Sequence, residues 1–131
     1  MQRILIADDH AVIRSGIRQI LIEEFAPAHI EEATDTTSLI EKALSQEWDI
    51  IISDISMPGG GGFEALKQIR EKKPQQKILI LSVYLADQYA THSLKAGANG
   101  FLNKDTASDE LSRAVKMILA GDHYFPPGIN P

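Results

Sequence analysis

The sequence predicts an α/β fold in which one parallel sheet carries helices on both faces. Short apolar runs of five to seven residues alternate with stretches whose apolar residues recur at helical spacing, and this alternation occurs five times in 131 residues. Each of the first four helical stretches lies between two apolar runs, as the crossover connections of parallel strands require. The chain is therefore expected to consist of βα units in one continuous series.

The strand candidates differ in how continuously apolar they are. The first, "RILIA" at 3–7, is apolar after its arginine, as expected of a strand buried on both faces. The second, "HIEEA" at 29–33, is more polar, so we expect it near an edge of the sheet. The remaining strands are predicted at "WDIIISD" (48–54), "KILILSV" (77–83) and "GFLNK" (100–104).

Helical periodicity fills the intervening segments. The predicted helical stripes are Val12 to Phe25, Leu39 to Leu44, Phe63 to Ile69, residues 86–96, and Leu111 to Leu119. Gly97 and Gly121 follow the last two helices, where a glycine commonly ends a helix. Thr106, with Asp109 three residues later, predicts a capping box. Five right-handed βα units favour the flavodoxin-like (βα)5 arrangement, with the strands in the order 2-1-3-4-5.

Composition narrows the class of protein. With 44% apolar and 24% charged residues, the chain resembles an ordinary globular domain, and the absence of cysteine excludes disulfides and thiolate chemistry. The apolar runs are far shorter than the ~20 residues of a membrane span, and the start of the chain lacks a secretory leader. We therefore expect a cytoplasmic protein without membrane contact. A net charge of −5 argues against DNA binding by this domain's own surface.

We expect one domain at residues 1–121 and the start of a linker at 122–131. The end of the chain, "YFPPGINP", contains three prolines and cannot continue a helix. A linker in this position predicts that a second domain follows.

Charged and hydroxyl side chains follow the strands at the edge where open parallel sheets carry their sites. Asp8 and Asp9 follow the first strand, Asp54 the third, Ser82 the fourth and Lys104 the fifth. Poorly solvated carboxylates repel one another, so a cation is expected among them. Three carboxylates without cysteine predict a Mg²⁺ site, and the lysine is placed to pair with the cluster and hold a phosphoryl oxygen.

Simpler roles exist for each residue taken alone. Asp8 or Asp9 could cap the first helix, and Asp54 could be a solvated strand end. His10 has no other histidine at metal-ligand spacing, so we interpret it as a first-turn residue. The glycine-rich segment 57–62 lacks the Lys-Ser/Thr of a phosphate-binding loop and is interpreted as a turn. The joint occurrence of the carboxylates, hydroxyl and lysine at matching strand ends favours a functional site.

Five segments together carry a resemblance to a known family: "ILIADDH..IRSGI", "DIIISDISMPGGGGFEAL", "ILILSVY", "AGANGFLNKD" and "AGDHYFPP". They cover nearly the whole chain. In them the chain resembles the receiver domain of two-component response regulators, most closely of the NarL/FixJ (LuxR-type) subfamily.

The resemblance implies a role for each strand-end residue. It makes Asp54 the phosphoryl acceptor and Asp9 a direct Mg²⁺ ligand, with Asp8 acting mainly through water. The backbone carbonyl of Ser56 is the implied third protein ligand, and Lys104 is the lysine that contacts the phosphoryl group.

The resemblance also implies a switch. Ser82 takes the place of the switch hydroxyl and Phe101 that of the switch aromatic residue. Ser56 and Tyr84 occupy positions that modulate hydrolysis of the acyl phosphate. Phe101 lacks the hydroxyl of the commoner tyrosine, so we expect packing alone to drive its inward rotation.

The implied function is a response regulator that accepts a phosphoryl group from a sensor histidine kinase and controls an output. That output is expected to be transcription through a C-terminal helix-turn-helix domain, with homodimerisation on phosphorylation and DNA contact only through that further domain. Such a protein catalyses its own phosphorylation and dephosphorylation but is not a turnover enzyme. One alternative is a stand-alone receiver that acts through protein–protein contacts. Another is a Mg²⁺-dependent phosphatase of the haloacid-dehalogenase kind, which needs Asp-x-Asp where this chain has adjacent aspartates.

Overall fold

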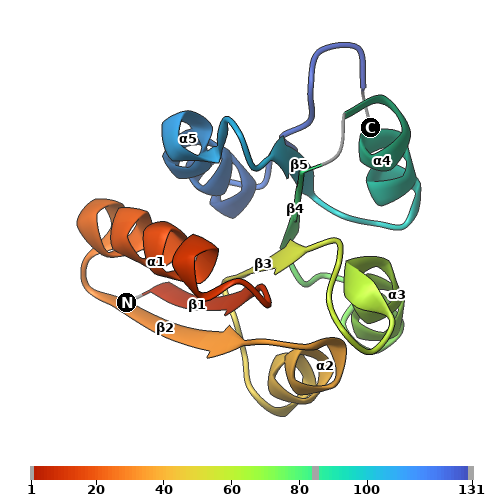
Figure 1. Ribbon diagram of the computed structural model, residues 1–131, viewed down its shortest axis with the longest axis horizontal. Helices are drawn as coiled ribbons and strands as arrows, with labels where there is room; N and C mark the ends of the chain where they lie inside the picture. The colour runs from red at the N-terminus through yellow and green to blue at the C-terminus, as the bar shows by residue number, and fades with distance from the viewer. Residues whose placement is uncertain (1, 84–85, 130–131) are drawn as a thin grey trace.

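Five parallel strands form a single sheet in the computed structural model, which describes residues 2–83 and 86–129 (Figure 1). The strands are β1 (Gln2–Ala7), β2 (Ala28–Ala33), β3 (Ile50–Asp54), β4 (Ile78–Ser82) and β5 (Gly100–Asn103). The helices are α1 (Ala11–Phe25), α2 (Thr36–Ser45), α3 (Gly61–Lys72), α4 (Ala86–Lys95) and α5 (Ala107–Leu119). The strand order β2-β1-β3-β4-β5 confirms the predicted flavodoxin-like fold and the edge position of the second strand.

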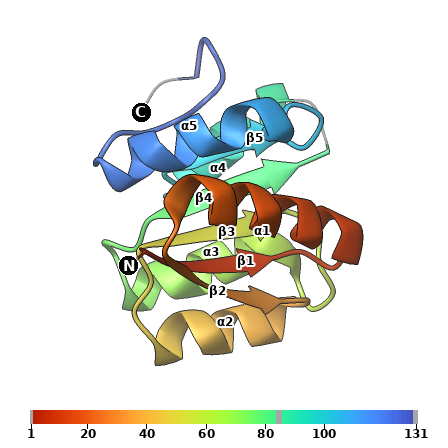
Figure 2. The same cartoon turned by 90° about the vertical axis from the view of Figure 1, so that its left-hand side faces the viewer.

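The sheet separates two layers of helices. Helices α1 and α5 cover one face, while α2, α3 and α4 cover the other (Figures 1 and 2). Successive residues of a strand point to opposite faces, so Ile50 and Ile52 pack in the core beneath α1 and α5, and Ile51 packs in the other core. Burial on both faces explains the apolar runs at 50–52 in β3 and 78–81 in β4.

The third strand begins later than predicted. Trp48 precedes β3, and its ring is buried while its indole Nε1 donates to the carbonyl oxygen of Lys42 at 2.9 Å. Asp49 accepts a hydrogen bond from the backbone N–H of Arg3 at 2.7 Å. These two residues therefore form the entry to the strand, because their polar groups are satisfied by neighbouring segments.

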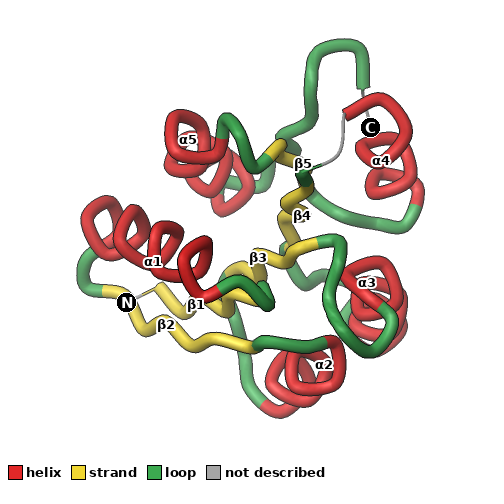
Figure 3. The backbone as a smooth tube through the Cα atoms, viewed as in Figure 1, coloured by secondary structure: helices red, strands yellow, loops and turns green. Residues whose placement is uncertain are grey.

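The helix ends agree with the sequence in two cases and differ in a third. Gly97 (φ 98°) and Gly121 (φ 99°) both have the left-handed conformation that ends a helix. Thr106 is the N-cap residue of α5, but the predicted capping box is wrong, because its side chain makes no cap hydrogen bond and its hydroxyl donates to the carbonyl oxygen of Asn103 at 3.2 Å. Figure 3 shows the short loops that connect these helices to the strands.

The segment after α5 runs beside the edge strand. The backbone N–H of Phe101 donates to the Tyr124 carbonyl at 2.8 Å, and the Tyr124 N–H donates to the Asn99 carbonyl at 3.0 Å. Phe125 and Ile129 pack against the core beneath α2, α3 and α4. The segment 122–129 thus packs on the domain. Its assignment as the start of a linker stays a prediction.

Among the described residues, no helix combines the length and the apolar character that crossing a bilayer requires.

Candidate functional site

Strand register brings the predicted site residues to one edge of the sheet. In the β1–β3 pair Ala7 lies opposite Ser53, so the following residues, Asp8 and Asp54, emerge side by side. In the β4–β5 pair Ser82 lies opposite Asn103, the residue before the lysine. The topology therefore gathers residues that are up to about a hundred positions apart in the sequence.

Lys104 lies between two buried carboxylates. Its Nζ is 2.8 Å from Asp8 Oδ2 and 3.1 Å from Asp54 Oδ2, and its side chain is only 7% exposed. The Lys104 backbone N–H donates to the Ser82 carbonyl at 2.8 Å, which fixes the start of the loop after β5. With Asp9 included, three carboxylates and one ammonium group carry a net charge of −2 when all are ionised. The lysine supplies part of the predicted positive charge. The negative charge that remains matches the charge of a divalent cation.

The buried position of Asp54 affects its protonation. Burial raises its pKa above the ordinary value of 3.8, and the charge of Asp8 raises it further, while Lys104 opposes both effects. Burial lowers the pKa of Lys104, but the hydrogen bond from its ammonium to Asp8 and the charges of Asp54 and Asp8 outweigh burial, so the net pKa is raised. The lysine is therefore held as a cation, and a further cation would favour the ionised form of Asp54.

Asp8, Asp9 and His10 form a tight cluster where β1 leads into α1. Asp8 Oδ1 accepts a hydrogen bond from the backbone N–H of His10 at 2.8 Å. His10 itself is the N-cap residue of α1. The simpler alternative, in which Asp8 or Asp9 caps this helix, is therefore not supported. The His10 ring lies against the acid pair, with Nδ1 at 3.1 Å from Asp8 Oδ1 and 3.1 Å from Asp9 Oδ1.

The sequence interpretation missed this placement of His10. It looked for a second histidine at ligand spacing, whereas the neighbouring groups here are the two aspartates directly before it. The position immediately after an acid pair and before a helix is the signal that could have indicated it.

The residues present fit a metal ion. One potential ligand atom from each of Asp8, Asp9, His10 and Asp54 lies within 4.8 Å of the others. A hollow of about 580 Å³ opens beside them, lined in part by Asp9, His10 and Ser56. Carboxylate oxygens at a solvent-accessible site are the ligands that Mg²⁺ prefers, because it keeps several of its waters.

The other predicted residues have distinct environments. Ser56 is exposed, and its backbone N–H donates to Asp54 Oδ1 at 3.3 Å, while the role of its carbonyl as a ligand stays a prediction. Ser82 is fully buried at the end of β4. Phe101 is 1% exposed and belongs to the core beneath α2, α3 and α4, so its ring is already inside. Tyr84 lies outside the described residues.

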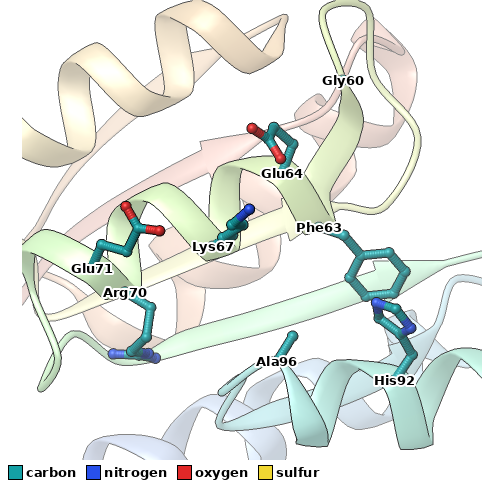
Figure 4. Close-up of a pocket in the computed structure, with 8 residues that line it drawn as sticks. All are labelled: Gly60, Phe63, Glu64, Lys67, Arg70, Glu71, His92 and Ala96. Carbon is teal, nitrogen blue, oxygen red and sulfur yellow. The ribbon is translucent and has the colours of Figure 1, made fainter.

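A larger hollow lies away from the acidic cluster, between α3 and α4. It has a volume of about 790 Å³, and Figure 4 shows the residues that line it. Phe63 and His92 pack against each other at one end of it, with ring centroids 4.2 Å apart (Figure 4). Arg70 at its other end donates to the Gly97 carbonyl at 2.7 Å. The carboxylate, ammonium and guanidinium side chains that line this hollow all belong to α3.

The family model of the response regulator receiver domain matches residues 4–116. The chain therefore belongs to the response regulator receiver family, which confirms the resemblance seen in the sequence.

Relatives of known name agree with this assignment. The chain is 37% identical over 126 residues to the oxygen regulatory protein NreC of Staphylococcus carnosus, a match that spans 95% of this chain and 58% of NreC. It is 35% identical over 127 residues to the transcriptional regulatory protein DegU of Brevibacillus brevis, spanning 97% of this chain and 54% of DegU. The chain thus spans a little more than half the length of these relatives.

Solved structures show the same fold. A two-component response regulator of the LuxR family from Aurantimonas sp. SI85-9A1 has a TM-score of 0.88 and 34% identity, covering 97% of this chain and 91% of that one. The isolated REC domain of RcsB from Salmonella enterica serovar Typhimurium, in the presence of the phosphomimetic BeF3−, has a TM-score of 0.87 and 27% identity. That match covers 98% of this chain and 95% of the RcsB domain. The LuxR-family neighbour agrees with the predicted subfamily.

Proposed function

We propose that this domain is a phosphorylation switch in which Asp54 accepts a phosphoryl group from the phosphohistidine of a sensor kinase. The observation that carries the proposal is the buried arrangement of Lys104 between Asp8 and Asp54, with Asp9 beside a solvent-accessible hollow. Mg²⁺, held by Asp9 and Asp54 with Asp8 behind them and the Ser56 carbonyl as a further ligand, would neutralise negative charge on the phosphoryl oxygens during transfer.

The transfer is a nucleophilic substitution at phosphorus. A carboxylate oxygen of Asp54 attacks phosphorus, and the new P–O bond forms as the P–N bond to the donor imidazole breaks. The electron pair of the broken bond leaves with the donor nitrogen. The product is an acyl phosphate, and its later hydrolysis returns Asp54 to its starting state without turnover of an external substrate.

Residues already in place would stabilise the phosphorylated state. The Lys104 ammonium, now shared between two carboxylates, can bind a phosphoryl oxygen, and the Ser82 hydroxyl at the adjacent strand end can donate to another. A phosphoryl group adds up to about two negative charges at this point. Hydrogen bonds to charged groups contribute roughly 1.5–3 kcal/mol each, so two or three reach the ~5.5 kcal/mol that inverts a 1:99 equilibrium. Phe101 would complete the switch by repacking within the core.

The partners follow from the same proposal. The phosphodonor is a sensor histidine kinase, and the site of action is the cytoplasm. DegU is named a transcriptional regulatory protein, and a similar structure of the RcsB response regulator from Salmonella typhimurium was solved to describe its conformational dynamism for DNA interaction. Because these relatives are longer than this chain, we infer that residues 122–131 lead to a helix-turn-helix domain that binds DNA, and that phosphorylation favours a homodimer.

Intact mass after incubation with acetyl phosphate tests the acceptor. We expect one added phosphoryl group that requires Mg²⁺ and is absent in Asp54→Asn. Asp105→Asn is the matched control, because this exposed aspartate follows Lys104 directly and its loss should leave the labelling unchanged. Labelling that persists in Asp54→Asn would contradict the assignment of the acceptor.

A further inference from the structure

We propose that His10 is an additional ligand of the metal site and sets its preference among divalent ions. Compared with a site made of oxygen ligands alone, a site that includes its imidazole would bind borderline metals such as Ni²⁺ and Co²⁺ more tightly. The inference rests on the proposed function only in that the same acidic cluster holds the ion.

The geometry of the His10 ring supports ligation. Nδ1 stands 3.1 Å from Asp9 Oδ1 and 3.1 Å from Asp8 Oδ1. An octahedral ion with bonds of about 2.1 Å places adjacent ligand atoms about 3.0 Å apart. The ring nitrogen and the Asp9 carboxylate oxygen therefore have the spacing of neighbouring ligands, without rebuilding of the loop.

The position of the ring also allows an ion to reach it from solvent. The His10 side chain is 66% exposed and lines the same hollow as Asp9, while Asp8 is buried behind them and paired with Lys104. The backbone of His10 is fixed by its N–H, which donates to Asp8 Oδ1 at 2.8 Å. An ion that enters from solvent thus meets the imidazole and the Asp9 carboxylate together.

A hydrogen-bonding role for the ring makes a different prediction. If His10 only donated a hydrogen bond that holds the acid pair in place, its removal would lower the affinity of the site for all ions by a similar factor. An asparagine, which can also donate, would then restore the affinity. A ligand role instead changes the ratio between borderline and hard ions, because imidazole adds to the affinity of Ni²⁺ much more than to that of Mg²⁺.

Calorimetric titration of the untagged chain with Ni²⁺ and with Mg²⁺, at one fixed pH, separates these roles. We expect His10→Ala to weaken Ni²⁺ binding by about tenfold or more and Mg²⁺ binding by less than about threefold. His10→Asn should not restore the Ni²⁺ affinity. His123→Ala, which removes an exposed histidine from the segment after α5, is the matched control and should leave both affinities unchanged.

A second readout concerns the ligand directly. Co²⁺ bound to the wild-type chain should give a visible absorption spectrum that changes in His10→Ala, since a nitrogen ligand alters the field at the metal. Equal losses for Ni²⁺ and Mg²⁺, or full recovery in His10→Asn, would overturn the proposal. The titrations use no phosphodonor, so this result is independent of whether Asp54 of the wild-type chain is phosphorylated.

Discussion

Replacing Lys104 by methionine removes the only charge that separates the buried Asp8 and Asp54 carboxylates within the described residues, and it preserves most of the side-chain volume. The ammonium group lies 2.8 Å from one carboxylate and 3.1 Å from the other. At an effective dielectric constant of about 20, these separations correspond to gross attractions of about 6 and about 5 kcal/mol. Desolvation of the three groups offsets much of this attraction, so the net effect is smaller.

Loss of one partner of a buried ion pair typically costs about 3–5 kcal/mol, because the remaining charge is left uncompensated. We expect the free energy of unfolding of Lys104→Met to fall by this amount in urea titrations with a chelator present. A domain with about 5–15 kcal/mol of stability would remain folded. Mg²⁺ should restore more stability to the variant than to the wild type, since the two carboxylates have lost their own cation.

Lys116→Met provides the matched control. Lys116 is 58% exposed and pairs with Glu24 at 3.4 Å, so its loss should cost no more than about 1 kcal/mol. If Lys104→Met cost no more than this control, the electrostatic account of the site would be refuted.

Two further predictions concern the same edge of the sheet. Because the pKa of Asp54 is raised above 3.8, the native state keeps a proton that the unfolded chain has lost, so the contribution of Asp54 to stability falls as pH rises from 3.8 through the raised value. In urea titrations with a chelator, the free energy of unfolding should therefore change more positively with rising pH in Asp54→Asn than in the wild type; equal pH dependences would contradict this. In Gly62→Ala the new methyl would press on the Asp54 carbonyl oxygen and lie 3.0 Å from Ile55 Cα, which should cost about 1–3 kcal/mol. Gly16 lies within α1, and a Cβ added there would have no atom within 4 Å. Gly16→Ala should therefore raise the free energy of unfolding by about 0.5–1 kcal/mol, and a lower melting temperature in thermal unfolding would contradict this.

The fold and most of the site could be predicted because both depend on patterns that the topology enforces. A central strand buried on both faces carries apolar residues at successive positions, so the apolar runs of β1, β3 and β4 stand out in the sequence. Parallel connection then places every carboxyl end at one edge, which brings Asp54 and Lys104 together from distant positions.

Features that depend on side-chain direction could not be predicted in the same way. The Thr106 pattern is that of a cap, but the hydroxyl turns to the Asn103 carbonyl. Trp48 has the aromatic character of a strand residue, yet its indole bonds to the end of α2. The ring of His10 is directed by two carboxylates whose position is set only once β1 has paired with its neighbours.

In the switch that we propose, Phe101 starts from a buried position. Its ring is already inside, so a signal cannot depend on moving an exposed ring into an empty space. The connections of the backbone supply another route: the Lys104 N–H bonds to the Ser82 carbonyl, and the Phe101 N–H bonds to the Tyr124 carbonyl. The Tyr124 hydroxyl in turn donates to Glu110 on α5 at 2.6 Å. A shift of the β4 and β5 ends toward Asp54 would therefore be transmitted through β5 to the segment after α5, which is where a following domain would be attached.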